Sequence, residues 1–515
     1  MRKARIPCET QNMCFVRLRR DGKDEKLQLG EAALMSTFLA RGRSRSVEPE
    51  HPQDECGVFA IAAISNVSVD IFYALRVLQH RGQESAGIAV YNNGIKAIKG
   101  MGLAHQALKP DDIKNLKGTL GIGHVRYSTF GSSTIENAQP IVVSTTYGDI
   151  ALAHNGEIVN ADRIMDDLKK KGWAFITSSD SEIAVRLLAN DIANTGDPVR
   201  SLKNLMGMLQ GSYSMTAMID NRIFALRDPL GVRPLCIGRT KVGYAAASES
   251  VVFDTLGGEF LRDVEPGEIV ELTPGEIKPV KTGLSRGRAH CMFEWVYIAR
   301  ADSCIDGKLV YEVRHRIGQR LAKEQPVNAD VVVPIPDSGR SHANGYSEAS
   351  GIRYAEGLMK NRYVERTFIM PEQSERTTSV MLKLNPLKSV LKDKKVVLVD
   401  DSIVRGTTMR QIVQLVRNAG AKEVHVRIGS PPIRAPCYFG IDMKTRDQFA
   451  ATGRTVEEIG KMLTADSLGY LSVEGLVEAI GHPAGDLCLG CLTEEYPMPV
   501  PGEKVRYQKK LDSFV

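Results

Sequence analysis

The sequence predicts a chain of several domains whose C-terminal half contains an α/β domain. At 515 residues the chain exceeds the usual size of one domain. Residues 396–413, VVLVDDSIVRGTTMRQIV, open with an apolar run that is typical of a buried strand. A helical pattern starts near Met409 and stops near Gly420, and a further strand follows at 424–428. This order predicts a βαβ unit, in which ligands bind outside the carboxyl ends of the strands.

The loop that follows the first of these strands carries groups that suit a phosphorylated sugar. Asp400 and Asp401 come directly after the strand, and adjacent carboxylates suit sugar hydroxyls and a hard cation such as Mg²⁺. Gly406 lets the backbone approach an anion closely. Thr407 and Thr408 add hydroxyls and free N–H groups at a helix N-terminus, which attracts phosphate. The alternative is an ordinary turn with solvated aspartates, although an acidic pair is costly at the end of a buried strand.

Composition and charge exclude several classes of protein. A hydrophobic content of 43% and a charged content of 25% are ordinary for a soluble protein. The net charge of +6 is mild, and a polyanionic small substrate accounts for it, so nucleic acid is not indicated. No apolar run reaches the roughly 18 residues that span a bilayer. The nine cysteines are irregularly spaced, so we expect a reducing cytoplasmic location without a disulfide framework.

Residues 1–55 differ from the rest of the chain. They are rich in arginine, lack sustained periodicity and end in RGRSRSVEPEHPQDE. They could form a disordered or removable leader, a targeting peptide or a nucleic-acid-binding arm. The acidic residues Asp21, Asp24, Glu25 and Glu31 count against the second and third alternatives. We therefore expect a leader.

A cysteine opens the apolar, strand-like run at 56–63, and several polar clusters follow it. A lone cysteine in such a run is usually a small buried hydrophobic residue. Each downstream cluster, however, lies beside a strand-like or helix-like apolar run, where loops that carry function are found. These clusters lie at 81–87, 123–129, 154–156 and 179–182.

Together with Cys56, these clusters resemble the class II glutamine amidotransferase domains, which are N-terminal-nucleophile (Ntn) hydrolases. The resemblance covers roughly residues 56–280 and implies a four-layer αββα sandwich. It also implies cleavage between Glu55 and Cys56, after which the α-amino group of Cys56 acts as the base for its own thiol. A free α-amine titrates at about 7.7–8.0, close to the operating pH.

The same resemblance assigns roles to four further residues. Arg126 would bind the α-carboxylate of glutamine, and Asp180 would hold the α-ammonium. Asn155 and Gly156 would form the oxyanion hole of the tetrahedral intermediate. For Arg126 and Asp180 the alternative is a pair of surface salt-bridge residues.

Residues 396–413 resemble the phosphoribosyl pyrophosphate (PRPP) loop of the type I phosphoribosyltransferases. The resemblance implies that PRPP contacts Arg405, Gly406, Thr407 and Thr408. Ser338, which follows the apolar strand-like run 331–335, matches a Mg²⁺ ligand that acts together with Asp400 and Asp401.

Residues 363–384 resemble the mobile loop that closes over PRPP in related enzymes. Lys383 keeps its position as a substrate contact, whereas Met381 stands where bacterial relatives usually carry arginine.

Four cysteines of the C-terminal half predict a metal centre. Cys488 and Cys491 form a CxxC motif, which alone indicates zinc, redox chemistry or chance. Cys291 and Cys437 match the remaining ligands of the 4Fe–4S cluster that some related enzymes carry. A four-thiolate zinc site is the alternative. In either case we expect a structural role.

Taken as a whole, the chain resembles the amidophosphoribosyltransferase family. The resemblance implies a leader at 1–55, a class II glutamine amidotransferase (Ntn) domain at 56–285 and a phosphoribosyltransferase domain at 286–515 that ends in the cysteine-rich segment. It implies that glutamine is hydrolysed at Cys56 and that ammonia passes to PRPP to give 5-phosphoribosylamine, the first committed step of purine synthesis. Homotetramers and inhibition by purine nucleotides are implied as well. The alternative is a non-catalytic regulator that binds PRPP or nucleotides.

Overall fold

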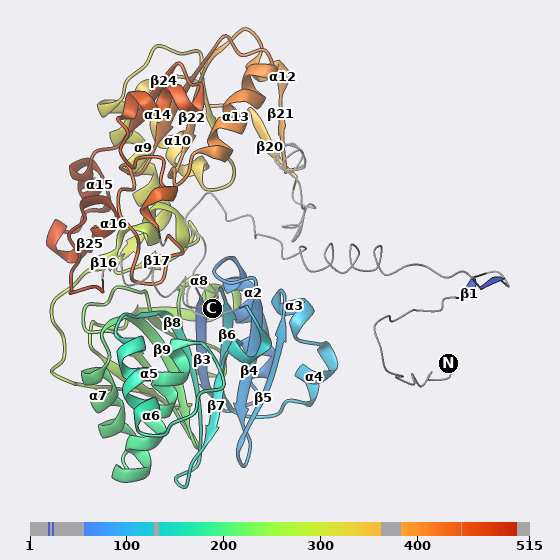
Figure 1. Cartoon of the computed structure of the whole chain (residues 1–515), viewed down its shortest axis with the longest axis vertical. Helices are drawn as coiled ribbons and strands as arrows, with labels where there is room; N and C mark the ends of the chain where they lie inside the picture. Colours follow the sequence, from blue (N-terminus) through green and yellow to red (C-terminus); the bar gives the residue numbers. More distant parts are fainter. Residues whose placement is uncertain are drawn as a thin grey trace, which may run out of the picture. The chain divides into compact units, whose positions relative to one another are not determined.

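The computed structural model describes four stretches of the chain and one short hairpin (Figure 1). The stretches are 56–127, 133–361, 383–443 and 445–501, and the hairpin pairs β1 (Arg19–Arg20) with β2 (Lys23–Asp24). The four stretches belong to one compact unit, Pro49–Tyr363 with Ser379–Val515. Most of the predicted leader and most of the predicted loop at 363–384, including Met381, lie outside the described residues.

Two antiparallel sheets form the N-terminal half. The strand order of the first is β13-β11-β12-β3-β6-β4-β5, and that of the second is β15-β14-β10-β9-β8-β7. The first sheet consists of β3 (Gly57–Ala63), β4 (Ser85–Tyr91), β5 (Ile95–Met101), β6 (Leu120–Arg126), β11 (Cys236–Arg239), β12 (Gly243–Ala247) and β13 (Glu259–Asp263). The second consists of β7 (Ile141–Ser144), β8 (Asp149–Ile158), β9 (Gly211–Ile219), β10 (Arg222–Arg227), β14 (Ile269–Leu272) and β15 (Ile277–Val280).

The side chains of β3 explain why the two sheets stack. Its alternate residues Val58 and Ala60 pack in a core that also contains Ala151 and Ala153 of β8, so the two sheets share one apolar layer. The intervening residues of β3 pack instead with α2 (Ser68–Val77) on the outer face.

Helices cover the outer faces of both sheets (Figure 1). Together with α2, the first sheet is accompanied by α3 (Ala104–Ala107), α4 (Pro110–Asn115) and α8 (Val251–Thr255), and the second by α5 (Ala161–Lys170), α6 (Asp180–Thr195) and α7 (Pro198–Met208). The predicted αββα sandwich is confirmed.

The C-terminal half contains a parallel sheet of order β19-β22-β23-β24. Its strands are β19 (Val331–Pro334), β22 (Lys395–Asp400), β23 (Glu423–Ile428) and β24 (Ser467–Tyr470). The helices packed with it are α9 (Val310–Glu324), α10 (Gly339–Ser350), α13 (Thr407–Asn418), α14 (Val456–Leu463) and α15 (Val473–Ile480). In β22, Val397 packs in the core on the α9–α10 side and Val396 in the core on the α13 side. Both faces of the sheet are covered, which confirms the α/β prediction for this half.

The βαβ unit differs in one detail from the sequence prediction. The helix begins at Thr407 rather than near Met409, because Gly406 takes a positive φ of +87° and turns the chain directly into α13. The strand predicted at 424–428 is β23, and all its residues after Glu423 are buried because helices cover both faces of the sheet.

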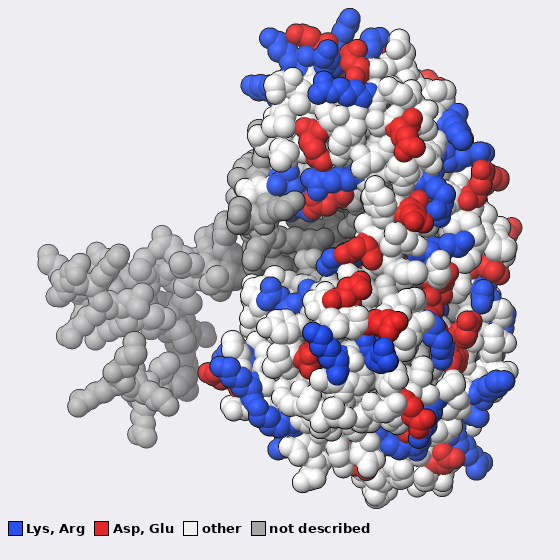
Figure 2. Space-filling view, turned by 180° about the vertical axis from the view of Figure 1, so that it is seen from behind, with Lys and Arg blue, Asp and Glu red and all other residues white. Residues whose placement is uncertain are grey.

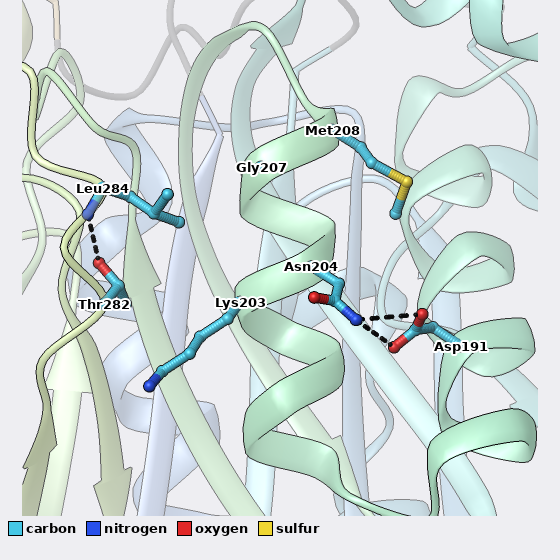
Figure 3. A pocket seen from close by; sticks show the side chains of 7 residues that line it. All are labelled: Asp191, Lys203, Asn204, Gly207, Met208, Thr282 and Leu284. Carbon is cyan, nitrogen blue, oxygen red and sulfur yellow. Dashed lines mark hydrogen bonds between the residues drawn. The ribbon is translucent and has the colours of Figure 1, made fainter.

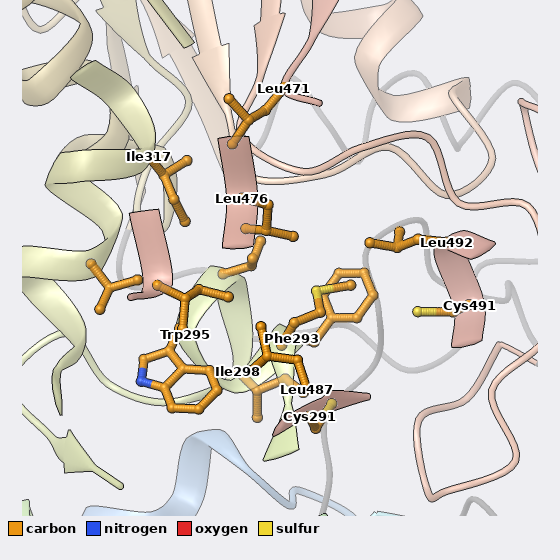
Figure 4. Packing of buried hydrophobic residues seen from close by; sticks show 14 of the residues in the cluster. Cys291, Phe293, Trp295, Ile298, Ile317, Leu471, Leu476, Leu487, Cys491 and Leu492 are labelled. Carbon is orange, nitrogen blue, oxygen red and sulfur yellow. The ribbon is translucent and has the colours of Figure 1, made fainter. Parts of the chain in front are cut away.

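The segment between the two halves passes through a buried π-helical turn, η3 (Glu294–Ile298). Figure 4 shows Phe293 and Trp295 of this segment packed with Ile317 of α9 and Leu476 of α15. Trp295 is fully buried. Two short strands lie in the same region: β16 (His290–Cys291) pairs in parallel with β25 (Leu487–Cys488).

The surface is mixed in charge. Acidic and basic side chains intermingle over the described residues on the face that Figure 2 displays, so the net charge of +6 is not gathered into one patch there. Within the described stretches, no helix combines the length and the apolar character that crossing a membrane requires.

Candidate active sites

The predicted nucleophile lies at the entrance to β3. The thiol of Cys56 donates to the carbonyl oxygen of Tyr127, with Sγ and O 3.4 Å apart. Burial raises the pKa of this thiol to about 11, and the nearby charge of Arg126 only partly opposes the rise. In the uncut chain the side chain is therefore a neutral thiol at pH 7, which is a poor nucleophile without a base.

Arg126 is brought to the nucleophile by strand pairing. It ends β6, and Gly57 of β3 pairs with its neighbour Val125. The side chain is buried, and its Nη1 lies 3.5 Å from Oε2 of Glu84. A buried guanidinium beside the thiol suits a carboxylate ligand.

Asp180 is the first residue of α6, and Ser179 caps that helix by accepting from the Ser181 N–H. Its Oδ2 accepts from the Ile158 N–H at 2.9 Å, and its Oδ1 lies 3.7 Å from Nδ1 of His154. Burial acts to raise the pKa of Asp180, but His154 and the backbone N–H groups of Ile158 and Ser181 outweigh it, and the pKa lies below its ordinary value. Asp180 is therefore an ionised, buried carboxylate that suits an ammonium group.

Asn155 and Gly156 lie side by side in β8. The Asn155 side chain is fully buried, and neither its Nδ2 nor its Oδ1 has a hydrogen-bond partner among the described residues. Leaving such a group unsatisfied costs about 1–3 kcal/mol, so its environment favours a polar ligand. Gly156 has a φ of +141°, and a Cβ at this position would collide with the carbonyl oxygen of Ser212. Glycine is therefore required at this position.

A buried charge network holds the backbone of Cys56, and sequence reasoning missed it. Nε of Arg81 donates to the Cys56 carbonyl at 3.2 Å. Its Nη1 donates to Glu249 and its Nη2 to Glu294, each at 2.7 Å, and all three charged side chains are almost fully buried. From the sequence alone, Arg81 lies in a polar cluster without a role, and Glu249 has no catalytic role. The signal that the sequence offered for this network was the position of these charged residues next to apolar runs.

The acidic pair of the C-terminal half is buried at the end of β22. The Asp401 N–H donates to Oδ1 of Asp400 at 3.0 Å, and the Ser402 hydroxyl donates to Oδ1 of Asp401 at 2.6 Å. Oδ2 of Asp400 is buried without a partner among the described residues. Burial, and after it the charge of Asp401, raise the pKa of Asp400 well above its ordinary value. A cation bound here would relieve the repulsion between the two carboxylates.

A small pocket lies beside this pair, at the N-terminus of α13. Asp400, Ser402, Gly406 and Thr408 line it, together with Ile403, Val404 and Met409. Of the predicted PRPP contacts, the structure therefore brings Gly406 and Thr408 to the acidic pair. Thr407 is the first residue of α13, and Nη2 of Arg405 donates to Gln448 at 2.7 Å.

Ser338 lies near the same edge of the sheet, and Lys383 lies on a separate hairpin. β19 pairs in parallel with β22, and the Ile335 N–H donates to the Val399 carbonyl at 2.9 Å, which fixes the two loops side by side. Ser338 precedes α10. The Lys383 carbonyl accepts from the Asn361 N–H at 2.8 Å, next to the hairpin of β20 (Leu358–Lys360) and β21 (Leu384–Pro386).

The four predicted cysteine ligands gather in one buried region. Cys291 of β16 lies directly opposite Cys488 of β25, and Cys491 belongs to the short helix α16 (Gly490–Thr493). Burial, and after it neighbouring thiols including Cys437, raise the pKa of Cys291 and Cys488 to about 12. Figure 4 shows Cys291 and Cys491 at the edge of the apolar cluster.

Each of the four residues is 7–8% exposed, and none forms a disulfide with another described residue. In the described stretches, no group of three or more His, Cys, Asp or Glu side chains is arranged to hold a metal ion.

A surface pocket on the N-terminal half contains none of the predicted site residues. It is lined by residues of α6 and α7 and of the loop after β15 (Figure 3), namely Asp191, Lys203, Asn204, Gly207, Met208, Thr282 and Leu284. Nδ2 of Asn204 donates to both carboxylate oxygens of Asp191, and the Thr282 hydroxyl accepts from the Leu284 N–H. Several of its polar groups are thus paired with one another.

Both halves of the chain match known protein domains. A glutamine amidotransferase domain model matches residues 124–255, and a phosphoribosyl transferase domain model matches residues 306–428. An amidophosphoribosyltransferase of Methanocaldococcus jannaschii is 52% identical over 468 residues, covering 87% of this chain and 99% of that protein. One of Archaeoglobus fulgidus is 53% identical over 435 residues, covering 84% and 95%.

Solved structures agree with these relatives. The glutamine PRPP amidotransferase from Bacillus subtilis complexed with ADP and GMP matches with a TM-score of 0.81 and 42% identity, covering 86% of this chain and 98% of that one. A structure described as the allosteric regulatory enzyme of purine biosynthesis matches with a TM-score of 0.82 and 43% identity, covering 86% and 97%. The chain therefore belongs to the amidophosphoribosyltransferase family.

Proposed function

We propose that the chain transfers the amide nitrogen of glutamine to C1 of PRPP and releases glutamate, pyrophosphate and 5-phosphoribosylamine. The observation that carries this proposal is the presence of both sites in one chain, the buried acidic pair and the Asn155–Gly156 pair that suits an oxyanion. That chain matches amidophosphoribosyltransferases over nearly their whole length. The reaction is the first committed step of purine synthesis. Bound ADP and GMP in the Bacillus subtilis relative support purine nucleotides as further ligands.

The first half-reaction uses Cys56 as its nucleophile. After cleavage behind Glu55, the α-amino group of Cys56 takes the thiol proton, and the sulfur attacks the amide carbon of glutamine. Asn155 Nδ2 and the Gly156 N–H stabilise the oxyanion. The proton then passes to the leaving nitrogen, ammonia departs, and water hydrolyses the glutamyl thioester.

Substrate orientation in this half-reaction follows from charge. Arg126 binds the α-carboxylate of glutamine, and the ionised Asp180 binds its α-ammonium.

The second half-reaction takes place at the acidic pair. The N-terminus of α13, with Arg405, Gly406, Thr407 and Thr408, binds the phosphorylated sugar, and Lys383 contacts the substrate from its hairpin. Asp400, Asp401 and Ser338 would hold Mg²⁺, which suits these oxygen donors and would neutralise charge on the departing pyrophosphate. Ammonia from the first site travels inside the protein, because in bulk water near pH 7 it becomes ammonium and loses its nucleophilic lone pair.

The assay that tests the proposal compares two nitrogen donors. With PRPP and Mg²⁺ present, the mature chain should release pyrophosphate with either glutamine or ammonia. If neither donor supports pyrophosphate release, the chain is a non-catalytic regulator that binds PRPP or nucleotides.

Removal of residues 1–55 should change the reactivity of Cys56. With its pKa near 11, the thiol of the uncut chain is ionised to only about one part in a thousand at pH 8. We expect alkylation by iodoacetamide at pH 8 to be at least about tenfold slower at Cys56 in the uncut chain than in a chain that begins at Cys56. The rate for the uncut chain should keep rising towards pH 11. Peptide mass spectrometry measures the labelling at this cysteine, and glutamine use by the uncut chain would contradict the proposed base.

Four buried thiols support a 4Fe–4S cluster held by Cys291, Cys437, Cys488 and Cys491. Burial, and after it the neighbouring thiols, raise the pKa of Cys291, Cys488 and Cys491, so these thiols would ionise only when a bound metal centre compensates their charge. We expect anaerobically purified protein to contain iron and acid-labile sulfide in equal amounts. A Cys488→Ser variant should lose both and unfold at a lower temperature. One zinc ion per chain in place of iron would establish the four-thiolate zinc site instead.

We further propose a cytoplasmic homotetramer from which residues 1–55 have been removed. Light scattering measures the mass of the assembly, and intact-mass spectrometry identifies the first residue of the mature chain.

A further inference from the structure

A short loop of the C-terminal half, Cys437–Gly440, lies directly against the strands of the N-terminal half. The carbonyl oxygen of Phe439 accepts from the Ser212 hydroxyl at 2.7 Å and from Nε of Arg233 at 2.7 Å. Nη2 of Arg233 donates to the same oxygen. All three donors are buried, and two of them belong to a guanidinium, which makes the stronger kind of hydrogen bond.

The same loop reaches the proposed oxyanion hole. Ser212 lies opposite Glu157 in the β8–β9 pairing, and its hydroxyl accepts from the Glu157 N–H at 3.3 Å. Gly440 has a φ of +107°, and a Cβ at this position would lie 3.1 Å from the Gly156 carbonyl carbon. The loop therefore contacts Gly156 directly and, through Ser212, the Gly156–Glu157 peptide unit.

We propose that the Cys437–Gly440 loop, held by Ser212 and Arg233, positions the oxyanion hole of the glutamine site. The inference rests on the proposed function. The Asn155 side chain has no hydrogen-bond partner among the described residues, so its direction depends on how firmly the β8 backbone is held. β9 fixes that backbone through strand pairing. The loop adds a contact at Gly156 and holds the Ser212 hydroxyl, which accepts from the Glu157 N–H. An oxyanion hole acts only when its donors are held in place before the reaction.

Two further contacts connect the loop to the support of Cys56 and to the Cys437 thiol. Nη1 of Arg233 lies 3.7 Å from Oε1 of Glu294, the carboxylate that anchors Arg81 and through it the Cys56 carbonyl. The Phe439 N–H donates to Sγ of Cys437 at 3.3 Å. The position of the loop thus depends on whatever holds the Cys437 thiol, and the loop connects that thiol to the supports of the glutamine site.

Two variants test the positioning role in the mature enzyme. Ser212→Ala removes one donor to the Phe439 carbonyl, and Gly440→Ala adds a methyl group against Gly156 at a positive φ. Removal of an oxyanion donor itself costs about 10²–10³ in kcat, so a displaced donor should cost less. We expect kcat for glutamine hydrolysis to fall about tenfold in both variants, while KM for glutamine changes less than about twofold. Ammonia-dependent pyrophosphate release should stay within about twofold of that of the unaltered enzyme, because the PRPP site is separate.

Ser201→Ala is the matched control. Ser201 is also a buried serine of the N-terminal half, and its hydroxyl bonds to that of Thr195 at 2.7 Å. Ser201→Ala should lower the unfolding temperature as Ser212→Ala does, yet leave both activities unchanged. The inference is wrong if Ser212→Ala and Gly440→Ala match this control in glutamine kcat, or if glutamine- and ammonia-dependent rates fall together. An unaltered enzyme without any glutamine-dependent activity would instead refute the proposed function.

Discussion

Cys56→Ala is expected to abolish glutamine-dependent synthesis and to leave ammonia-dependent synthesis in place. The variant loses the sulfur that forms the thioester, and with it the hydrogen bond to the Tyr127 carbonyl. Loss of a covalent nucleophile lowers kcat by roughly a thousandfold or more. The acidic pair belongs to a different sheet, so ammonia supplied from solution should still reach PRPP.

The measurement is pyrophosphate release with glutamine and, separately, with ammonium salts at pH 8 or above. Cys236→Ala is a matched control, because Cys236 is also a free thiol of the N-terminal half and its Sγ donates to the Ala247 carbonyl at 3.3 Å. This control should retain both activities. Residual glutamine use by Cys56→Ala would show that another residue is the nucleophile.

The secondary structure of the PRPP region could be predicted because its signals are local. An apolar β-branched run, an acidic pair, a glycine turn and an amphipathic helix follow one another within 396–419, and each dictates its element without help from distant residues. Only the start of α13 was misplaced, by the two residues that Gly406 brings into the helix.

The contacts that support the glutamine site could not be predicted from the sequence because they are not local. Arg81 meets Glu249 and Glu294, residues that are 168 and 213 positions away along the chain. Arg233 meets Phe439 across 206 positions. Such pairs satisfy buried charges, and their partners are set by how the sheets stack, which composition and periodicity do not specify.

Buried polar atoms without hydrogen-bond partners among the described residues show a further limit of prediction from sequence. Asn155 and Asp400 resemble their counterparts in the family by position, but only the structure shows that the Asn155 amide and one Asp400 oxygen are buried without partners among the described residues. A buried polar group without a hydrogen-bond partner costs free energy. The presence of such a group at each predicted site therefore favours a role in binding a ligand over a role in packing alone.

Asp401→Asn is expected to abolish synthesis with both nitrogen donors. Asparagine keeps the shape of the side chain and can still accept from the Ser402 hydroxyl, so the variant removes mainly the negative charge. Without that charge the site should hold Mg²⁺ weakly, and charge on the departing pyrophosphate would go uncompensated. Loss of one group that stabilises transition-state charge lowers the rate by about 100-fold or more.

Asp330→Asn provides a matched control at the opposite end of β22, where Oδ2 of Asp330 accepts from the Lys395 N–H at 2.8 Å. It should retain synthesis with both donors. In Asp401→Asn, calorimetric titration should show weaker binding of PRPP with Mg²⁺. Its unfolding temperature without Mg²⁺ should rise, because the charge of Asp401 helps to raise the pKa of the buried Asp400 and so opposes its ionisation. If Asp401→Asn released pyrophosphate normally from ammonia and PRPP, the acidic pair would have no part in the transfer.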